Sequence, residues 1–394
     1  MAYDFLNDLL VVEVSHFGPD ALGGRLADMG ARVIKVEDPD GGDPVRRAGP
    51  WSVGDPNGFS YLHLRWNRGK ESVVIDLGTE AGKQDFLTLA AKADVVIEGM
   101  RAGVMERLGL GFDALKAVHP AIVFCSLSGM GETGPYAKLA SHGPSFDAFG
   151  GLGMPLGDEI SRYGRPQAPS IGMYAYGLEA AFAVLAAVHR ARRTGEGAAI
   201  EVAAADCAAH WMPEALDPLL NPDTTVERPG FLDTHGKMRL WARMENYRCG
   251  DGKILFLMTY TDKSWRALLK LIGRPDLGEL YERTPATGAE DAEVNEALKA
   301  IFATRTRDEW MADFLRDNVA AMPVNSFADV IEDPHFQARG QTYSASLPDG
   351  RPLTLTSSAI RVRGQAFDMA LAPEYGADSQ AIHAEFALKG EGAK

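Results

Sequence analysis

The fold of this 394-residue chain is decided by residues 9–37, whose sequence is LLVVEVSHFGPDALGGRLADMGARVIKVE. Residues 9–15 form a short apolar run rich in valine, which is typical of a strand buried on both faces. Residues 16–30 contain Gly-Pro and then apolar residues at helical spacing, which predicts a turn followed by an amphipathic helix. Residues 31–37 read as a second buried strand. The stretch therefore predicts a β-α-β unit with two parallel strands.

The same alternation continues downstream of this unit. Residues 72–77 and 93–99 are predicted strands on either side of a helix over 80–92, and residues 121–129 add another strand. Strands that alternate with helices indicate an α/β fold with a doubly wound, mostly parallel sheet of the Rossmann type. From Gly177 to Arg192 the chain is almost entirely apolar, which predicts a buried helix.

A smaller α+β domain is predicted after the large one. Residues 244–260 have the pattern of a hairpin with a Gly-Asp-Gly turn. Helices are expected to follow over residues 262–272, 289–303 and 307–318, and strand and loop patterns after those. The predicted domains are a large α/β domain, a small α+β domain and a C-terminal return to the large domain, over residues 1–215, 225–325 and 326–394.

Composition limits the classes of function. The formal net charge of −14 argues against a dedicated nucleic-acid-binding protein. Cys125, Cys207 and Cys249 are scattered and form no C-x-x-C pair, which predicts reduced thiols, no disulfide framework and no metal site. The first residues lack a signal-peptide pattern, and no apolar run reaches the ~18 residues that a membrane span needs. We therefore expect a soluble, cytoplasmic protein.

Basic side chains gather at two places in this acidic chain. Asn67, Arg68 and Lys70 precede a predicted strand and offer several donors for phosphate oxygens, although a solvated basic turn has the same pattern. Arg46 lies in a loop rich in glycine and proline over residues 42–50. The glycines of the first turn do not have the G-x-G-x-x-G spacing, which argues against a dinucleotide site.

Three motifs together resemble the class III CoA-transferase family, of the CaiB/BaiF type, which includes the α-methylacyl-CoA racemases. They are LADMGARVIKVE (26–37), IEGMRAGVMERLGLGFDAL (97–115) and SLSGMGETGPYAKLASHGPSFDAFGGL (126–152). The resemblance implies coenzyme A as a substrate, held by the basic residues named above and by Arg101 and Arg107, for which surface salt bridges are the alternative. It also implies an interlocked, ring-like dimer and a small carboxylic acid as the second substrate.

The resemblance also indicates where the chemistry occurs. Transferases of this family acylate an aspartate just before the apolar helix, and Met173, which cannot be acylated, stands at that position. The racemases use a histidine with an aspartate, and the histidine role carries over to His142, which as an alternative is a structural hydrogen-bonding residue. Asp147 either supplies a carboxylate to the same pocket or caps a helix. His16 either donates to a thioester oxygen or caps the first turn.

Three functions follow from these patterns. The first, which we favour, is the transfer of CoA between an acyl-CoA and a carboxylic acid. The second is racemisation, epimerisation or isomerisation of an acyl-CoA with His142 as the base. The third is that of a non-catalytic subunit in a hetero-oligomeric transferase, partnered by a paralogue that carries the aspartate. The first two are compatible with a homodimer.

Overall fold

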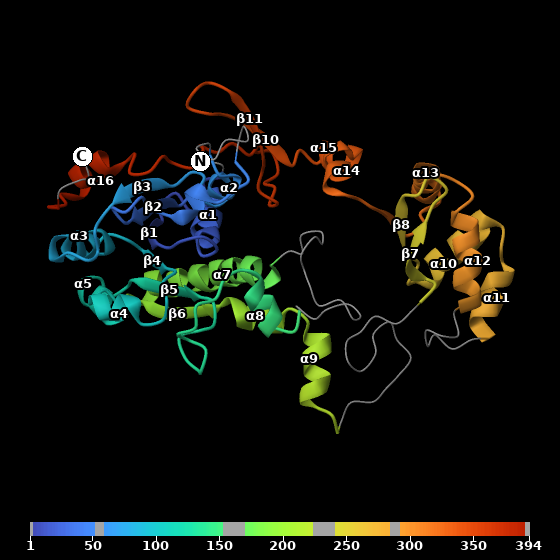
Figure 1. Cartoon of the computed structure of the whole chain (residues 1–394), viewed down its shortest axis with the longest axis horizontal. Coiled ribbons are helices and arrows are strands. Elements are labelled where there is room, and N and C mark those ends of the chain that lie inside the picture. Colours follow the sequence, from blue (N-terminus) through green and yellow to red (C-terminus); the bar gives the residue numbers. More distant parts are fainter. Residues whose placement is uncertain (1–2, 52–58, 153–169, 224–240, 284–291, 391–394) are drawn as a thin grey trace. The chain divides into compact units, whose positions relative to one another are not determined.

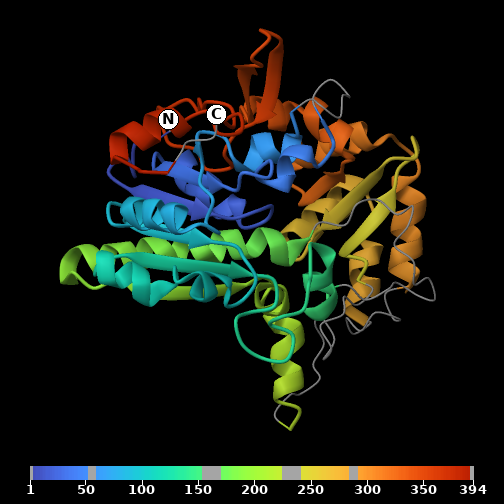
Figure 2. The same cartoon turned by 60° about the vertical axis from the view of Figure 1, so that its left-hand side comes forward.

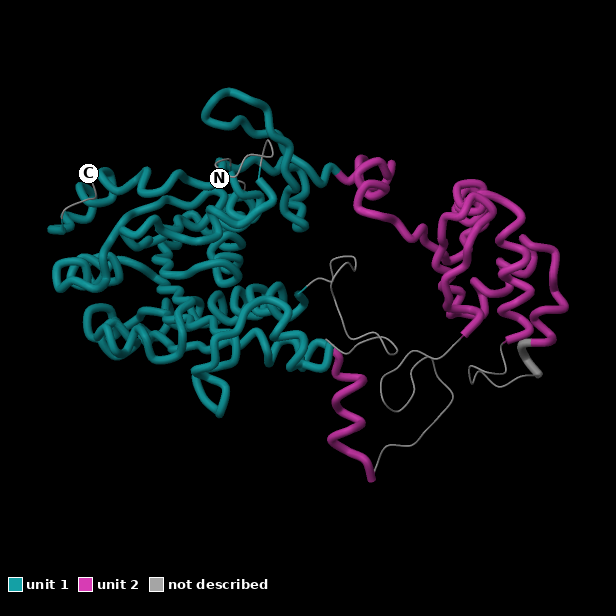
Figure 3. Tube along the Cα trace, viewed as in Figure 1, with its two compact units in different colours: residues 1–211, 340–394 teal, residues 212–339 magenta. Residues whose placement is uncertain are grey.

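The computed structural model describes residues 3–51, 59–152, 170–223, 241–283 and 292–390. The chain divides into two compact units (Figure 3): unit 1 comprises residues 1–211 and 340–394, and unit 2 comprises residues 212–339. The chain thus leaves the larger unit once and returns to it. The return lies at residue 340, whereas the sequence pattern put it at 326, and the predicted boundary at 225 lies outside the described residues.

Unit 1 is built on a six-stranded sheet with the order β3-β2-β1-β4-β5-β6 (Figure 1). Every neighbouring pair of strands in it is parallel. The strands are β1 (Leu10–Val14), β2 (Arg32–Glu37), β3 (Glu71–Val74), β4 (Val95–Glu98), β5 (Val123–Ser128) and β6 (Ala198–Ala203). This is the doubly wound order, in which the progression of strands reverses between β1 and β4. The α/β fold predicted from the sequence is therefore confirmed.

Helices cover both faces of this sheet (Figure 2). Val11 and Val12 of β1 point to opposite faces: Val11 packs with apolar residues of α1 and α7, and Val12 packs with those of α3, α5 and α16. The helical elements of unit 1 are α1 (Asp20–Asp28), η1 (Pro44–Arg47), α2 (Tyr61–Trp66), α3 (Glu80–Ala90), α4 (Val104–Leu108), α5 (Phe112–Val118), α6 (Pro144–Phe149), α7 (Ile171–Thr194), α8 (Ala204–His210) and α16 (Ser379–Phe386). A hairpin of β10 (Thr342–Ser346) and β11 (Pro352–Thr356) completes the unit.

Unit 2 is an α+β unit with an antiparallel sheet in the order β7-β8-β9. Tyr247, Phe302, Trp310 and Phe314 form the aromatic centre of its core. Its elements are α9 (Pro213–Leu220), β7 (Met244–Arg248), β8 (Ile254–Met258), α10 (Asp262–Ile272), α11 (Asp276–Arg283), α12 (Ala292–Phe302), α13 (Arg307–Asp317), β9 (Ala321–Val324), α14 (Phe327–Glu332) and α15 (Pro334–Ala338). The predicted hairpin and the helix over 262–272 are both present.

Residues 326–338 differ from the sequence prediction, because they form α14 and α15 where strand and loop patterns were expected. The Ser326 hydroxyl accepts a hydrogen bond from the Asp329 N–H, and the Asp329 carboxylate bonds back to Ser326, which is a capping box. Asp333 then caps α15, which has Pro334 in its first turn. Capping chemistry of this kind starts helices too short to show an apolar period.

Helix α7 is less buried than the sequence suggests. It begins at Ile171 and not at Gly177, and one face leaves Leu178 and Phe182 46% and 76% exposed. By length and composition alone this helix could cross a membrane. Its opposite face, however, packs into the cluster between α1 and the sheet. The apolar residues of α7 therefore lie on two faces of the helix. One face packs against the sheet, and the other is the exposed face that includes Leu178 and Phe182.

Candidate active site

The reversal of strand order between β1 and β4 marks the place where a ligand is expected. In doubly wound sheets, ligands bind outside the carboxyl ends of the strands at such a switch point. Here Val14 and Glu98 are register partners at the ends of β1 and β4. The segments that follow these strands, residues 15–19 and 99–103, therefore border the candidate active site.

The turn after β1 lies tightly against the start of α7. Phe17 has a φ of 58°, a left-handed conformation that is uncommon for residues other than glycine and is found disproportionately at functional sites. At Gly18 a Cβ atom would lie 2.9 Å from Cγ of Met173 and would collide with the Tyr176 hydroxyl. Only glycine permits this close approach, which brings Met173 to the switch point.

His16 is held in the same turn. Its side chain is 43% exposed, and its Nε2 atom lies 3.9 Å from the Asp38 carboxylate at the end of β2. Partial burial lowers the pKa of His16, and the nearby Lys35 ammonium lowers it further. His16 is therefore a neutral imidazole near pH 7, with one N–H available to donate. Its role toward a thioester oxygen stays a prediction.

Glu98 is a buried carboxyl at the end of β4. It is 5% exposed, and it accepts a hydrogen bond from the Ser126 hydroxyl of β5 and another, of 2.8 Å, from the backbone N–H of Met100. Burial raises the pKa of Glu98 to about 7. A carboxyl that titrates near neutral pH can accept or deliver a proton under working conditions.

Asp147 of α6 caps a helix, although not its own. Its Oδ1 accepts a hydrogen bond of 2.8 Å from the Gly172 N–H, and its Oδ2 accepts one of 3.1 Å from the Ile171 N–H. Both carboxylate oxygens are thus bonded to the first turn of α7, beside Met173. The capping alternative fits this geometry, and a catalytic role of Asp147 stays a prediction.

His142 lies two residues before α6 and is exposed. Within the described ranges its ring makes no hydrogen bond or ion pair, and the structure does not bond it to Asp147. The hydroxyl of Ser145 donates to the carbonyl oxygen of His142, which fixes the backbone of this turn. The role of His142 as a base stays a prediction too.

Arg101 and Arg107 lie after β4, on the switch-point side of the sheet. Both side chains are exposed, and in the part of the chain that the structure describes neither has an ion pair or a side-chain hydrogen bond. Exposed guanidinium groups present several donors to anionic oxygens, and the contact of Arg101 and Arg107 with CoA phosphates stays a prediction.

The other predicted CoA-binding residues are engaged inside the protein. Arg68 makes two bonds of 2.7 Å to the buried Asp28 carboxylate. Asn67 donates to Asp20 at 3.0 Å, and Lys70 donates to Glu13 at 2.7 and 2.8 Å. Buried charges require such partners, so basic residues near buried acids are drawn inward. The expected free donors for phosphate are thus not present at these residues in this structure, and their contact with CoA stays a prediction.

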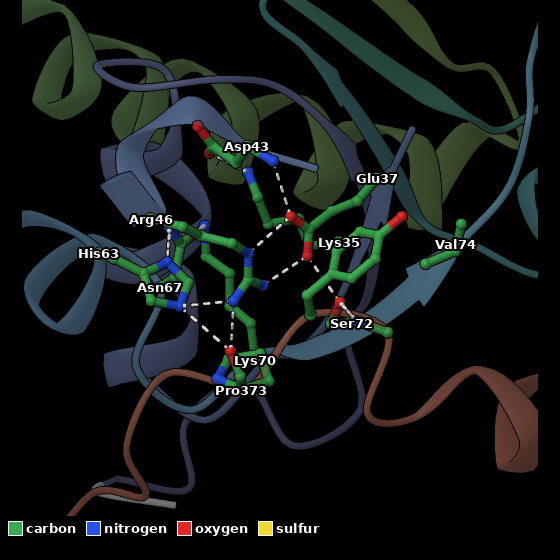
Figure 4. A network of polar contacts seen from close by, with 12 residues as sticks. Lys35, Glu37, Asp43, Arg46, His63, Asn67, Lys70, Ser72, Val74 and Pro373 are labelled. Atoms are coloured by element: carbon green, nitrogen blue, oxygen red, sulfur yellow. Dashed lines mark hydrogen bonds and ion pairs between the residues drawn. The ribbon is translucent and has the colours of Figure 1, made fainter. Parts of the chain in front are cut away.

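Arg46 is likewise bonded within the chain (Figure 4). Its guanidinium forks onto Glu37 at the end of β2, with bonds of 2.5 and 2.9 Å, and also donates to the carbonyl oxygen of Pro373 at 2.9 Å. Burial alone would raise the pKa of Glu37. The hydrogen bond and the charge of Arg46, together with hydrogen bonds from the Asp43 N–H and the Ser72 hydroxyl, outweigh burial and hold the pKa at about 2.

A cluster of buried charges lies beneath the turn after β1. The fully buried Lys35 ammonium lies 2.7 Å from Asp20, 2.9 Å from Asp43 and 3.3 Å from Glu13. Three carboxyls thus share two ammonium groups, those of Lys35 and Lys70, so one carboxyl keeps its proton. Burial and the neighbouring Asp20 raise the pKa of Asp43 to about 8, and burial also raises the pKa of Glu13, so the retained proton belongs to this group of carboxyls as a whole.

This cluster fixes the turn of the candidate site. Asp20 is the first residue of α1, and the Ser15 hydroxyl at the end of β1 donates to it at 2.5 Å. The backbone oxygen of Ser15 accepts a further bond of 2.8 Å from Lys35. Ser15 and Asp20 are therefore both bonded to Lys35 of β2. Phe17, with its left-handed backbone conformation, lies between these two fixed residues.

A metal centre was not expected from the sequence. Among the residues that the structure describes, no group of three or more His, Cys, Asp or Glu side chains is arranged to hold a metal ion.

Comparison with known proteins identifies the family. The model of CoA-transferase family III matches residues 6–379, nearly the whole chain. The chain belongs to CoA-transferase family III. It is 33% identical to the alpha subunit of succinyl-CoA–L-malate CoA-transferase from Chloroflexus aurantiacus, over 85% of this chain and 77% of the subunit. The beta subunit of the enzyme of that name is 30% identical, over 80% of this chain and 76% of the subunit.

Two further similarities cover more of this family III chain. The succinyl-CoA:mesaconate CoA-transferase of Haloarcula marismortui is 31% identical, over 91% of this chain and 90% of that enzyme. The crystal structure of a CaiB/BaiF family protein from Brucella suis superposes with a TM-score of 0.76 at 30% identity, and covers 98% of this chain and 100% of that one. The predicted family is therefore confirmed.

The sequence reasoning missed Glu98 in this family III chain. Its signal was an acidic residue at the end of a buried strand, in the sequence VVIE (95–98). Such a residue has to be bonded, protonated or functional, because burial of a free carboxylate is costly. Which of these applies depends on Ser126, which lies 28 residues away in sequence.

Proposed function

We propose that this chain transfers coenzyme A between an acyl-CoA thioester and a carboxylic acid, and that succinyl-CoA is a donor. The family match over residues 6–379 carries this proposal. The switch point supplies features that suit it: a neutral His16, the titratable Glu98, and the exposed Arg101 and Arg107. The succinyl-CoA transferases among the relatives support the choice of donor.

Met173 bears on how the transfer proceeds. If the family's aspartate position is occupied by Met173, as the resemblance implies, this side chain cannot form an anhydride with the substrate. CoA transfer is still a balanced reaction without an anhydride between the enzyme and the substrate. The acceptor carboxylate attacks the thioester carbonyl, the CoA thiolate leaves, and a mixed anhydride of the two acids forms. The thiolate then attacks the acceptor's carbonyl in that anhydride and releases the donor acid as its carboxylate. This route requires both acids in one complex.

A second candidate function is that of a non-catalytic subunit. It is favoured by Met173 and by the similarity to both the alpha and the beta subunit of the succinyl-CoA–L-malate enzyme. In that case this chain pairs with a paralogue that carries the aspartate. We propose the cytoplasm as the location in both cases.

The exposed face of α7 supports an oligomer. Tyr174, Leu178, Phe182 and Leu185 follow one another at helical spacing and are 37–76% exposed. A contiguous apolar face of this kind is typical of an interface between chains. We propose that a second chain, in the predicted interlocked dimer or in a heteromer with a paralogue, covers it.

Mass spectrometry in deuterated water tests the proposed function. The purified chain is incubated with succinyl-CoA and a panel of free acids, and the CoA esters are identified. New CoA esters are the expected result. Deuterium at the α-carbon without new esters would replace the proposal by proton chemistry, with His142 as the first candidate base. Binding of CoA with neither product would favour the subunit function.

A further inference from the structure

The hydroxyl of Tyr176 lies at the turn after β1, which borders the candidate active site. Tyr176 follows Met173 by one turn of α7, so both side chains are on the same face of the helix. A Cβ atom at Gly18 would collide with the Tyr176 hydroxyl and would lie 2.9 Å from Cγ of Met173. Three groups therefore meet at the switch point: the backbone of Gly18, the thioether of Met173 and the phenol of Tyr176.

The ring and the hydroxyl of Tyr176 have different surroundings. The residue is only 3% exposed, and its ring packs in the apolar cluster that α7 forms with α1 and the sheet. Among the residues that the structure describes, no group forms a hydrogen bond with the hydroxyl, and the protein does not enclose the hydroxyl oxygen. The small accessible part of Tyr176 therefore includes the atom that can donate a hydrogen bond.

The protein groups near this hydroxyl do not use it. The Asp20 carboxylate is close enough to act on it electrostatically. The two oxygens of that carboxylate, however, already accept hydrogen bonds from Ser15, Lys35 and Asn67. Cys207, the other neighbouring group, offers a sulfur atom that is a weak acceptor. A phenylalanine would fill the apolar cluster equally well, so the hydroxyl calls for a partner from outside the chain.

The surroundings of Tyr176 keep its hydroxyl protonated. Burial raises the pKa of Tyr176 well above its ordinary value, and the neighbouring Asp20 and Cys207 raise it further. A tyrosine in this state donates a hydrogen bond and does not act as a base near neutral pH. Such a donor is suited to a substrate oxygen on which negative charge develops during the reaction.

We propose that Tyr176 is a catalytic residue that donates a hydrogen bond from its hydroxyl to the carbonyl oxygen of the acyl-CoA thioester. This proposal rests on the proposed transferase function. Attack by the acceptor carboxylate forms a C–O bond at the thioester carbon, and the π electron pair of the carbonyl moves to its oxygen. The proton stays on Tyr176 and stabilises this oxyanion. The pair then re-forms the carbonyl as the C–S bond breaks and the CoA thiolate leaves.

Met173 is compatible with this role of Tyr176. A carboxylate at position 173 would lie on the same helix face, one turn from the hydroxyl, and would compete with the substrate for its proton. The thioether of Met173 is a weak acceptor and leaves the donor free. The phenol therefore assists transfer by the route that needs no protein nucleophile.

Tyr176→Phe tests the role, because it keeps the ring in the cluster and removes only the hydroxyl. With succinyl-CoA as donor, kcat for CoA transfer is expected to fall about a hundredfold with little change in KM, the usual effect of losing one oxyanion donor. Tyr174→Phe loses the same atom from the exposed face of α7 and is expected to keep the kcat of the unaltered chain. Melting temperatures establish that both variants are folded. A kcat of folded Tyr176→Phe within twofold of the unaltered chain would overturn the proposal.

A second measurement does not depend on turnover. Succinyl-CoA with ¹³C at the thioester carbonyl is bound without an acceptor acid, and the carbonyl stretch is recorded by isotope-edited infrared difference spectroscopy. A hydrogen bond to the oxygen polarises the carbonyl and lowers its frequency, so a lower frequency is expected in the unaltered chain than in Tyr176→Phe. Equal frequencies would overturn the contact. A frequency difference without any new CoA ester would confirm the hydrogen bond and refute the transferase function, so the two proposals fail separately.

Discussion

The Asp147 carboxylate lies 2.8 Å from the backbone nitrogen of Gly172, so a side chain of α6 holds the first turn of α7. This contact determines where Met173 lies, because Met173 is the next residue along the helix. Gly18 approaches from the other side and leaves no room for a side chain of its own. The start of α7 is thus clamped between α6 and the turn after β1.

Asp147→Ala is expected to destabilise the protein by about 1–2 kcal/mol, the usual effect of losing a cap that satisfies helix N–H groups. Asp147→Asn keeps one acceptor oxygen and is expected to cost less. Urea denaturation followed by circular dichroism measures both, with Asp113→Ala as an exposed control on α5. A stable Asp147→Asn variant that has lost all CoA transfer would contradict a purely structural role and favour a catalytic one.

Met173→Asp is expected to create a nucleophile at the switch point. After incubation with an acyl-CoA, intact-mass spectrometry is expected to show a covalent adduct on this variant and none on the unaltered chain. Met173 packs against two apolar clusters, so a loss of roughly 1–3 kcal/mol in unfolding free energy is expected as well. Met173→Leu is the matched control without a nucleophile. An adduct on the unaltered chain would contradict transfer without a protein nucleophile.

Glu98 is expected to make stability depend on pH. Its folded-state pKa of about 7 lies above the ordinary value of 4.5, so the folded protein keeps a proton that the unfolded chain loses. The contribution of Glu98 to stability is therefore most favourable below pH 4.5 and falls as pH rises to 7, by about 3 kcal/mol at most. Glu98→Gln removes this dependence. Denaturation midpoints at several pH values measure it, and the exposed Glu179→Gln serves as control. Parallel pH curves for Glu98→Gln and the unaltered chain would contradict the prediction.

Arg46 is expected to stabilise the folded protein through its ion pair with Glu37, and this stabilisation depends on pH. The pKa of Glu37 is about 2 in the folded state, below the ordinary value of 4.5, so its stabilisation is complete above pH 4.5 and is lost as pH falls toward 2. Arg46→Gln removes the ionic partner of the buried Glu37 and leaves its carboxylate bonded to the Asp43 N–H and the Ser72 hydroxyl, which is expected to cost about 3 kcal/mol near pH 7. Arg47→Gln is the control, because Arg47 is exposed and bonds only the Gly41 carbonyl in the described residues. Equal losses in the two variants would rule out the Glu37 pair as the cause.

The exposed face of α7 is expected to form the interface between the chains of the oligomer. Phe182→Glu places a charge in the centre of the apolar stripe and is expected to shift the sedimentation of the protein toward the monomer. Phe327→Glu alters an equally exposed aromatic residue of unit 2 and is the control. An unchanged sedimentation coefficient of the folded Phe182→Glu variant would exclude this face as the interface.

The sequence predicted which residues lie near the candidate site, but it did not predict which side chains are bonded to one another. The sequence placed His16, Arg101 and Arg107 after strands, and the structure puts all three at the carboxyl edge. It could not reveal that Lys70 pairs with Glu13, 57 residues away, or that Arg68 pairs with Asp28, 40 residues away. A basic residue before a strand has the same local pattern whether it faces solvent or a buried acid.

The sequence by itself determined the alternation of strands and helices at the start of the large unit, the parallel doubly wound class and the family, because these depend on local periodicity and on motifs contiguous in the chain. The tertiary structure alone decided which charges are buried together, that Asp147 caps α7, and that Glu98 meets Ser126 at the switch point. These contacts join residues far apart in the chain. Their energies arise from burial and from the loss of water around charged groups, which a linear pattern does not record.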